Sequence, residues 1–184
     1  MLNLVTAHRE ASETLVRHPG VDKVSFTGST VAGKRIASLC GERIARCTLE
    51  LGGKSAAVVC EDYDIAKAAK QLAATITLSS GQVCATLSRV LVPRRLQKQY
   101  ADAIAAELRA VKVGDPMDPA SQMGPLSMER QLQRVVGYME KGRAEGAQLV
   151  CGGGRSKHMD KGWYFDPTLF TDVQSGMTIA QEEI

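Results

Sequence analysis

Apolar residues follow two different spacings along the chain, and short apolar runs typical of strands alternate with segments of helical spacing. The predicted strands cover residues 2–6, 21–26, 43–51, 55–60, 89–93, 147–154 and 163–170. The predicted helices cover residues 10–17, 30–39, 64–76 and 95–111, and another helix is predicted to begin after Ser127. This alternation predicts an α/β fold with a largely parallel sheet.

Two of the predicted helices each have one apolar face, which is typical of a helix that packs against a core. In the helix over 64–76 this face consists of Ile65, Ala68, Ala69, Leu72, Ala73 and Ile76. In the helix over 95–111 it consists of Leu96, Tyr100, Ile104, Leu108 and Val111. Gly41 is expected to end the helix over 30–39, and Ser127 is expected to cap a later one. The apolar run 55–60 is expected to be a strand buried on both faces.

The two ends of the sequence lack the polar segments that usually flank a domain. A predicted strand begins almost at once, and the last residues, MTIAQEEI, stop in the middle of a pattern. Residues 113–126 are rich in proline and glycine and predict a connecting loop. We therefore expect the chain to be a piece of a larger protein.

The composition is that of an ordinary globular protein. Of the 184 residues 44% are hydrophobic and 23% are charged, and the net charge is +3. Nucleic-acid binding is not expected, because there is no basic stripe with interleaved aromatic residues. Membrane insertion is not expected either, because the apolar runs are too short to span a bilayer. The first residues do not resemble a signal peptide, so we expect a cytoplasmic protein.

The five cysteines are odd in number, and their spacing matches neither a zinc site nor a disulfide framework. Cys40, Cys60 and Cys151 have apolar neighbours and are expected to be small core residues. Cys84 differs, because it follows Gly81 and Gln82 in a polar turn. The three histidines are scattered, so no Ser-His-Asp arrangement and no metal site is expected.

The stretch VDKVSFTGSTVAGKR, residues 21–35, predicts a strand, a glycine turn and the start of a helix. Gly28, Gly33 and Lys34 have the spacing of a nucleoside-triphosphate loop, but Arg35 stands where Ser or Thr should coordinate magnesium. Asp62, at the tip of the strand over 55–60, could supply the acidic residue of such a site. The missing hydroxyl argues against a P-loop nucleoside triphosphatase, because arginine cannot coordinate magnesium.

Two other interpretations of the same turn stay open from these residues alone. The turn could bind nothing, or it could be a simple anion site without a metal. Backbone amides around Gly28, Ser29 and Thr30 would lie at the positive end of a helix dipole, which suits a pyrophosphate. In that arrangement Arg35 would point away along the helix.

Two further features are typical of catalytic residues. Glu50 lies between two leucines, directly before Gly52 and Gly53, where the backbone could approach a ligand closely. A solvated glutamate is the plainer interpretation. Cys84 follows a glycine-containing turn after a helix, where a nucleophile would be placed, although a lone cysteine is more often a buried core residue. Together, a phosphate turn, a carboxylate and a cysteine suggest covalent redox chemistry on a carbonyl.

The order and spacing of several motifs resemble the NAD(P)-dependent aldehyde dehydrogenase superfamily. The motifs are VSFTGSTVAGKRIA, LELGGKS, GQVC followed by Arg89, KVGDPMDPASQMGPL, AEGAQLVCGGG, GWYFDPTLFTDV and IAQEEI. The resemblance covers essentially all 184 residues. It favours the dinucleotide interpretation of the turn, with NAD or NADP as the cofactor and an aldehyde as the substrate.

The resemblance implies a role for individual residues. Cys84 matches the nucleophile that adds to the aldehyde and forms a thioester, and Glu50 matches the general base that activates water. Gly28 and Ser29 match the turn at the cofactor pyrophosphate. The positions near the nicotinamide and its ribose are matched by Leu51, Gly52 and Glu183.

The resemblance also implies two domains and several missing parts. Residues 1–50 match the end of the dinucleotide-binding domain, and residues 51–184 match the front of the catalytic domain. The lysine at the adenosine ribose, the asparagine of the oxyanion hole and the segment through which family members form homo-oligomers fall outside the sequence. Ser79 stands where the family usually has Asn. We expect little NAD(P) reduction from these 184 residues alone, and a non-catalytic truncated product is the alternative.

Overall fold

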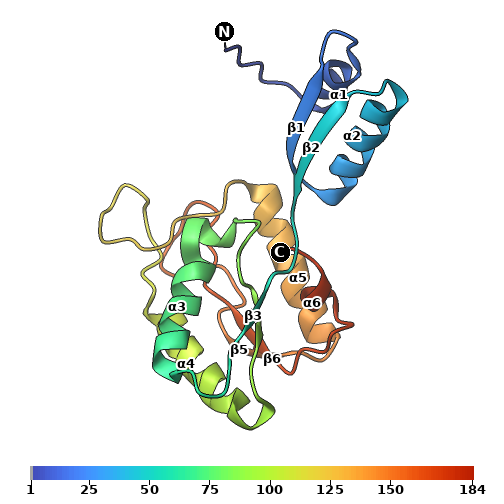
Figure 1. Cartoon of the computed structure of the whole chain (residues 1–184). Coiled ribbons are helices and arrows are strands. Elements are labelled where there is room, and N and C mark those ends of the chain that lie inside the picture. The colour runs from blue at the N-terminus through green and yellow to red at the C-terminus, as the bar shows by residue number, and fades with distance from the viewer. Residues whose placement is uncertain (1) are drawn as a thin grey trace. The chain divides into compact units, whose positions relative to one another are not determined.

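The computed structural model describes residues 2–184 and divides into two compact units, Met1–Gly52 and Gly53–Ile184 (Figure 1). The division falls close to the predicted boundary between residues 50 and 51. The assignment of the two units to a cofactor domain and a catalytic domain stays a prediction.

The first unit contains α1 (Arg9–Arg17), β1 (Lys23–Gly28), α2 (Thr30–Glu42) and β2 (Arg46–Leu51). The strands β1 and β2 pair in parallel, from Lys23 opposite Arg46 to Gly28 opposite Leu51, and Figure 1 shows them side by side. Because α2 connects two parallel strands, β1, α2 and β2 form one βαβ unit. The buried residues of α2 are Gly33, Leu39 and Cys40.

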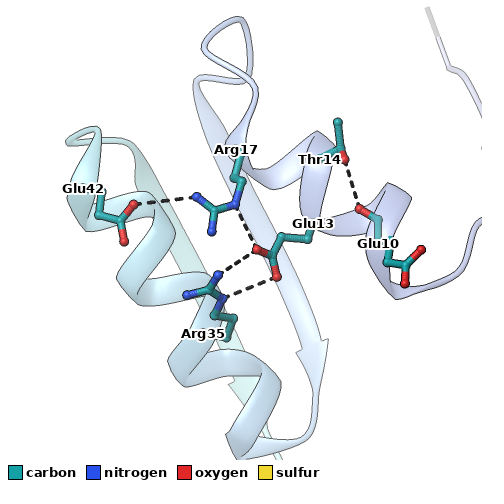
Figure 2. Close-up of polar contacts among 6 residues, drawn as sticks. All are labelled: Glu10, Glu13, Thr14, Arg17, Arg35 and Glu42. Carbon is teal, nitrogen blue, oxygen red and sulfur yellow. Dashed lines mark hydrogen bonds and ion pairs between the residues drawn. The ribbon is translucent and has the colours of Figure 1, made fainter.

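An ion-pair network joins α1 to α2 at the surface of the first unit (Figure 2). The carboxylate of Glu13 accepts from Arg35 Nη2 at 2.8 Å and from Arg17 Nε at 2.9 Å. Arg17 Nη1 also lies 3.9 Å from Glu42 Oε2. The hydrogen bond from Arg35, followed by that from Arg17, lowers the pKa of Glu13 to about 2. Arg35 is thereby held against α1.

The second unit begins with the parallel pair β3 (Ala56–Val58) and β4 (Arg89–Leu91). Between them lie α3 (Ile65–Thr77) and the short 3₁₀ helix η1 (Leu78–Gly81). After β4 the chain forms η2 (Arg94–Leu96), α4 (Gln97–Ala110), α5 (Glu129–Ala144), β5 (Gln148–Cys151), β6 (Leu169–Thr171) and α6 (Thr178–Gln181). The strands β5 and β6 are antiparallel. The α/β class is therefore confirmed, and two of the three strand pairs in residues 2–184 are parallel.

Two apolar clusters form the core of the second unit. In the first cluster the predicted faces of α3 and α4 meet, with Tyr100 1% and Leu108 2% exposed. The helix α3 begins close to the predicted start, and Asp64 caps it, since Asp64 Oδ1 accepts from Lys67 N–H at 2.7 Å. The second cluster surrounds α5 and consists of Leu126, Leu132, Val135, Tyr138, Met139, Ala147, Phe165 and Ile179.

Several predictions for single elements are wrong. Residues 2–6 form no strand, and Leu2 and Leu4 are exposed without a strand beside them in the described residues. The strand over 55–60 is reduced to β3, and the expected burial of both its faces is wrong, since Val58 is 72% exposed. Cys60, which follows it, is exposed as well.

Two predicted helix ends also differ from the structure. The helix α2 continues through Gly41, its predicted end, to Glu42. The residue with left-handed backbone after the helix is Ile44, whose φ is +57°. The N-cap of α5 is Met128, which makes no side-chain cap. The backbone N–H of Ser127 instead donates to the side chain of Gln82, so Ser127 links this segment to another part of the unit.

Candidate active site

In the first unit, the predicted residues Glu50, Leu51 and Gly28 lie at one edge of the two-stranded sheet. Gly28 is the last residue of β1 and Leu51 the last residue of β2, and their Cα atoms are register partners. Glu50, one position earlier, pairs with Thr27 and is exposed, whereas Leu51 is half-buried. The carboxyl ends of parallel strands are where α/β sheets bind ligands. Gly52 continues from this edge.

Ser29 directly follows β1 and caps α2. Its Oγ accepts from Ala32 N–H at 3.3 Å, and its carbonyl oxygen accepts from Gly33 N–H at 2.9 Å. The other amides of the first helical turn have no partner within the helix, as at any helix start, and they lie at the positive end of the helix dipole. These donors beside the strand ends fit the pyrophosphate of a dinucleotide.

Gly33 and Arg35, which belong to the stretch whose spacing resembles a nucleoside-triphosphate loop, make other contacts in the structure. A Cβ added at Gly33 would lie 2.6 Å from a methyl carbon of Leu51, so this glycine lets α2 pack closely on β2. Arg35 pairs with Glu13 and points away from the turn along α2, as the anion-site interpretation expects (Figure 2). The glycine spacing is therefore explained without a triphosphate.

In the second unit, Cys84 lies in a turn between η1 and β4 and is exposed. The turn is entered through three consecutive residues with left-handed backbone, Ser79, Ser80 and Gly81, whose φ values are 49°, 58° and 76°. After Cys84 the turn closes tightly, because Thr86 N–H donates to the carbonyl oxygen of Val83 at 3.0 Å. This backbone course presents the thiol at the surface.

The five cysteines fall into two groups. Cys40 and Cys151 are buried, and burial raises the pKa of both thiols above the ordinary value. Cys47, Cys60 and Cys84 are exposed. Because the thiolate is the nucleophile, the two buried cysteines are poor candidates for covalent chemistry.

The second unit contains a cavity of about 590 Å³. Gln82 and Val83, which precede Cys84, line it together with Lys54, Arg89 and the predicted ribose ligand Glu183. Burial lowers the pKa of the Lys54 ammonium, and Arg89 acts in the same direction while Glu183 opposes it. Glu183 is exposed at the chain end, and its carbonyl oxygen accepts from Arg134 Nη2 at 2.9 Å.

The structure thus distributes the predicted residues over both units. Five of them lie in the first unit, namely Gly28, Ser29, Glu50, Leu51 and Gly52, and Cys84 and Glu183 lie in the second. Sequence reasoning assigned no role to Lys54 or Gln82, although both lie inside the quoted motifs. Their neighbours in space come from distant segments, so no local pattern could have identified them.

Residues 2–184 contain neither a candidate metal site nor a candidate membrane-spanning helix. No group of three or more His, Cys, Asp or Glu side chains there could hold a metal ion. Among the helices of the same residues, none combines the length and apolar composition needed to cross a membrane.

Comparison with known proteins supplies the wider context. Betaine aldehyde dehydrogenase from Brucella anthropi is 44% identical over 186 aligned positions, which cover all of this chain and 38% of that protein. The crystal structure of Mycobacterium tuberculosis aldehyde dehydrogenase complexed with NAD+ superposes with a TM-score of 0.92 at 44% identity, over 95% of this chain and 36% of that one. A mutant of aldehyde dehydrogenase C from Pseudomonas syringae, complexed with NAD+ and octanal, gives a TM-score of 0.91 at 36% identity, over 94% and 36% of the two chains.

These relatives are longer proteins, and the chain spans little more than a third of their length. The family model of the aldehyde dehydrogenases matches residues 1–184, that is, the sequence from end to end. The motifs, the α/β fold and this match agree, and the chain belongs to the aldehyde dehydrogenase family.

Proposed function

We propose that the protein containing this segment oxidises an aldehyde to a carboxylic acid with NAD or NADP. The observation that supports this most strongly is the family match over residues 1–184, which includes the Glu50 and Cys84 motifs in their expected order. Relatives solved with NAD+ support the cofactor assignment. The first unit is then the end of the cofactor domain and the second unit the front of the catalytic domain.

Cofactor binding would use the edge of the first unit. The amides at the start of α2 and the turn at Gly28 and Ser29 would hold the pyrophosphate, while Leu51 and Gly52 would lie near the nicotinamide. Glu183 would hold the nicotinamide-side ribose. When bound, the nicotinamide ring supplies the acceptor for the hydride that the substrate loses.

The chain's own residues would perform the covalent steps. The thiolate of Cys84 adds to the aldehyde carbon, forming a C–S bond and an oxyanion that the backbone N–H of Cys84 helps to stabilise. Loss of hydride from that carbon restores the C=O bond and leaves a thioester on Cys84. Glu50 removes a proton from water, the hydroxide adds to the thioester, and the thiolate departs as the acid forms.

A matched pair of cysteine variants tests this proposal. NAD(P)-linked oxidation of aldehydes is measured with the longest natural chain that contains residues 1–184. Cys84→Ala should abolish the activity, and Cys60→Ala should retain it, because Cys60 is another exposed thiol of the same unit without an assigned role. Activity that survives Cys84→Ala would refute the assignment.

The remaining parts of the proposal concern partners and location. A small-molecule aldehyde is the expected partner, and no role for nucleic acid or membranes is proposed. We infer a cytoplasmic location from the sequence features described above. Homo-oligomers, if formed, would use a segment outside residues 1–184.

A further inference from the structure

The backbone before Cys84 has a conformation that its residues do not favour by themselves. Left-handed backbone is unfavourable for a residue with a Cβ. Ser79 and Ser80 both adopt it, with φ values of 49° and 58°. Such residues persist only where the surrounding structure holds them. Contacts outside the turn must therefore keep this conformation in place.

Two side chains of the turn reach the same distant segment, residues 124–127. Ser80 Oγ donates to the carbonyl oxygen of Gly124 at 3.0 Å. Gln82 Oε1 accepts from the backbone N–H of Ser127, also at 3.0 Å. These bonds join positions 44 and 45 residues apart in sequence.

Gln82 also makes two hydrogen bonds within the turn. Its Nε2 donates to the carbonyl oxygen of Ser79 at 3.2 Å, and its backbone N–H donates to the same oxygen at 3.1 Å. One amide side chain therefore connects the left-handed residues to the segment 124–127. The hydroxyl of Ser79, in contrast, makes no hydrogen bond within the described residues.

The segment 124–127 is itself fixed to the core. Leu126 is 7% exposed within the cluster around α5, and its N–H donates to the carbonyl oxygen of Trp163 at 3.0 Å. The preceding Met123 is 8% exposed and accepts from Gly114 N–H at 3.0 Å. The two bonds from the turn thus end on a firmly packed part of the unit.

We propose that Ser80 and Gln82 are positioning residues that fix the backbone of Cys84 by tying its turn to residues 124–127. This inference rests on the proposed function of Cys84 as nucleophile, because a reacting thiol needs a defined position. Neither residue is assigned contact with substrate. Both act through the turn.

The experiment uses the longest natural chain that contains residues 1–184, with Ser80→Ala and Gln82→Met, which remove the side-chain hydrogen bonds with little change in size. Ser79→Ala is the matched control. Ser79 also has a left-handed backbone, but its hydroxyl makes no hydrogen bond in the described residues. Circular dichroism shows that each variant remains folded.

The first measurement is amide hydrogen exchange at Ser127. Gln82→Met should accelerate it by about two- to tenfold, the factor that corresponds to one hydrogen bond of ordinary net strength. Gln82→Glu keeps an acceptor oxygen and should preserve slow exchange. Unchanged exchange in Gln82→Met would overturn the link.

The second measurement is the rate of Cys84 alkylation by iodoacetamide, followed by peptide mass spectrometry with Cys60 as internal reference. A synthetic peptide of residues 78–90 gives the rate of an unrestrained thiol. The wild-type rate should differ from that of the peptide. Ser80→Ala and Gln82→Met should move it toward the rate of the peptide, and Ser79→Ala should not.

The outcomes distinguish the positioning role of Ser80 and Gln82 from the assignment of Cys84 as nucleophile. If Cys84 of the wild type behaves like the peptide, the turn gives the thiol no special position, and the inference is wrong. If the wild type differs from the peptide but the two variants match the wild type, the inference is wrong while the nucleophile assignment stands. The assignment itself is tested separately, by loss of activity in Cys84→Ala.

Discussion

Replacing Gly81 with alanine tests whether the turn before Cys84 has the left-handed backbone described above. Gly81 has a φ of +76°, and an added Cβ would lie 3.2 Å from the carbonyl oxygen of Ile76. The left-handed conformation costs alanine about 1–2 kcal/mol relative to glycine. That contact is tight as well, so we expect Gly81→Ala to lower the free energy of unfolding of the second unit by at least about this amount.

Gly137 provides a control with the opposite sign. It lies within α5, and a Cβ added there would meet no atom within 4 Å apart from its chain neighbours and the backbone of its own helix. Alanine favours a helix interior over glycine by about 0.8–1 kcal/mol, so Gly137→Ala should stabilise the unit by that amount. The two variants, which make the same chemical change, should differ by about 2–3 kcal/mol.

Urea unfolding followed by Trp163 fluorescence measures this difference, because the only tryptophan lies in the second unit. If Gly137→Ala stabilises the protein and Gly81→Ala leaves it unchanged or more stable, residue 81 does not have a left-handed backbone. The description of the turn that presents Cys84 would then be wrong.

Three further predictions concern the ion-pair network, the core and the thiols. The pKa of Glu13 is lowered from 4.5 to about 2, so its contribution to stability is present above pH 4.5 and disappears as the pH falls from there to about 2. Because the network is exposed to solvent, this contribution is small; thermal unfolding followed by circular dichroism should show a larger fall in Tm over this pH range in the wild type than in Glu13→Gln, and equal falls would contradict the role of the network. Leu108→Ala, at a site 2% exposed, should destabilise the second unit by about 2–5 kcal/mol in the Trp163 unfolding assay, whereas Met117→Ala, at an 87% exposed site, should change it little. Iodoacetamide should label Cys84 before the buried Cys40 and Cys151, and faster labelling of either would count against the nucleophile assignment.

Much of the fold follows from local patterns. Asp64 and the apolar face behind it define α3 at its observed start, because the cap and the stripe act within one helix. The strand over 2–6 fails for the opposite reason. An apolar run forms a strand only where another strand pairs with it, and Leu2 and Leu4 have no such partner in the described residues.

The candidate site is predictable only in part. Gly28, Glu50 and Leu51 share a sheet edge because a βαβ unit brings the carboxyl ends of its strands together, and this follows from the alternating pattern. The bond between Gln82 and Ser127 joins residues 45 positions apart. Ser127 resembled a helix cap, and only its place in the folded unit reveals its partner.

The most direct test of the proposed chemistry is the mass of the Cys84 peptide after a single turnover. The experiment uses the longest natural chain containing residues 1–184, as the wild type and as Glu50→Gln. Each protein is mixed with propanal and NAD+ or NADP+, and the reaction is then stopped with acid before the protein is digested. The account predicts a propanoyl group on Cys84 that decays quickly in the wild type and persists in Glu50→Gln. Reduced cofactor without acyl on Cys84, or equal decay in both proteins, would contradict it.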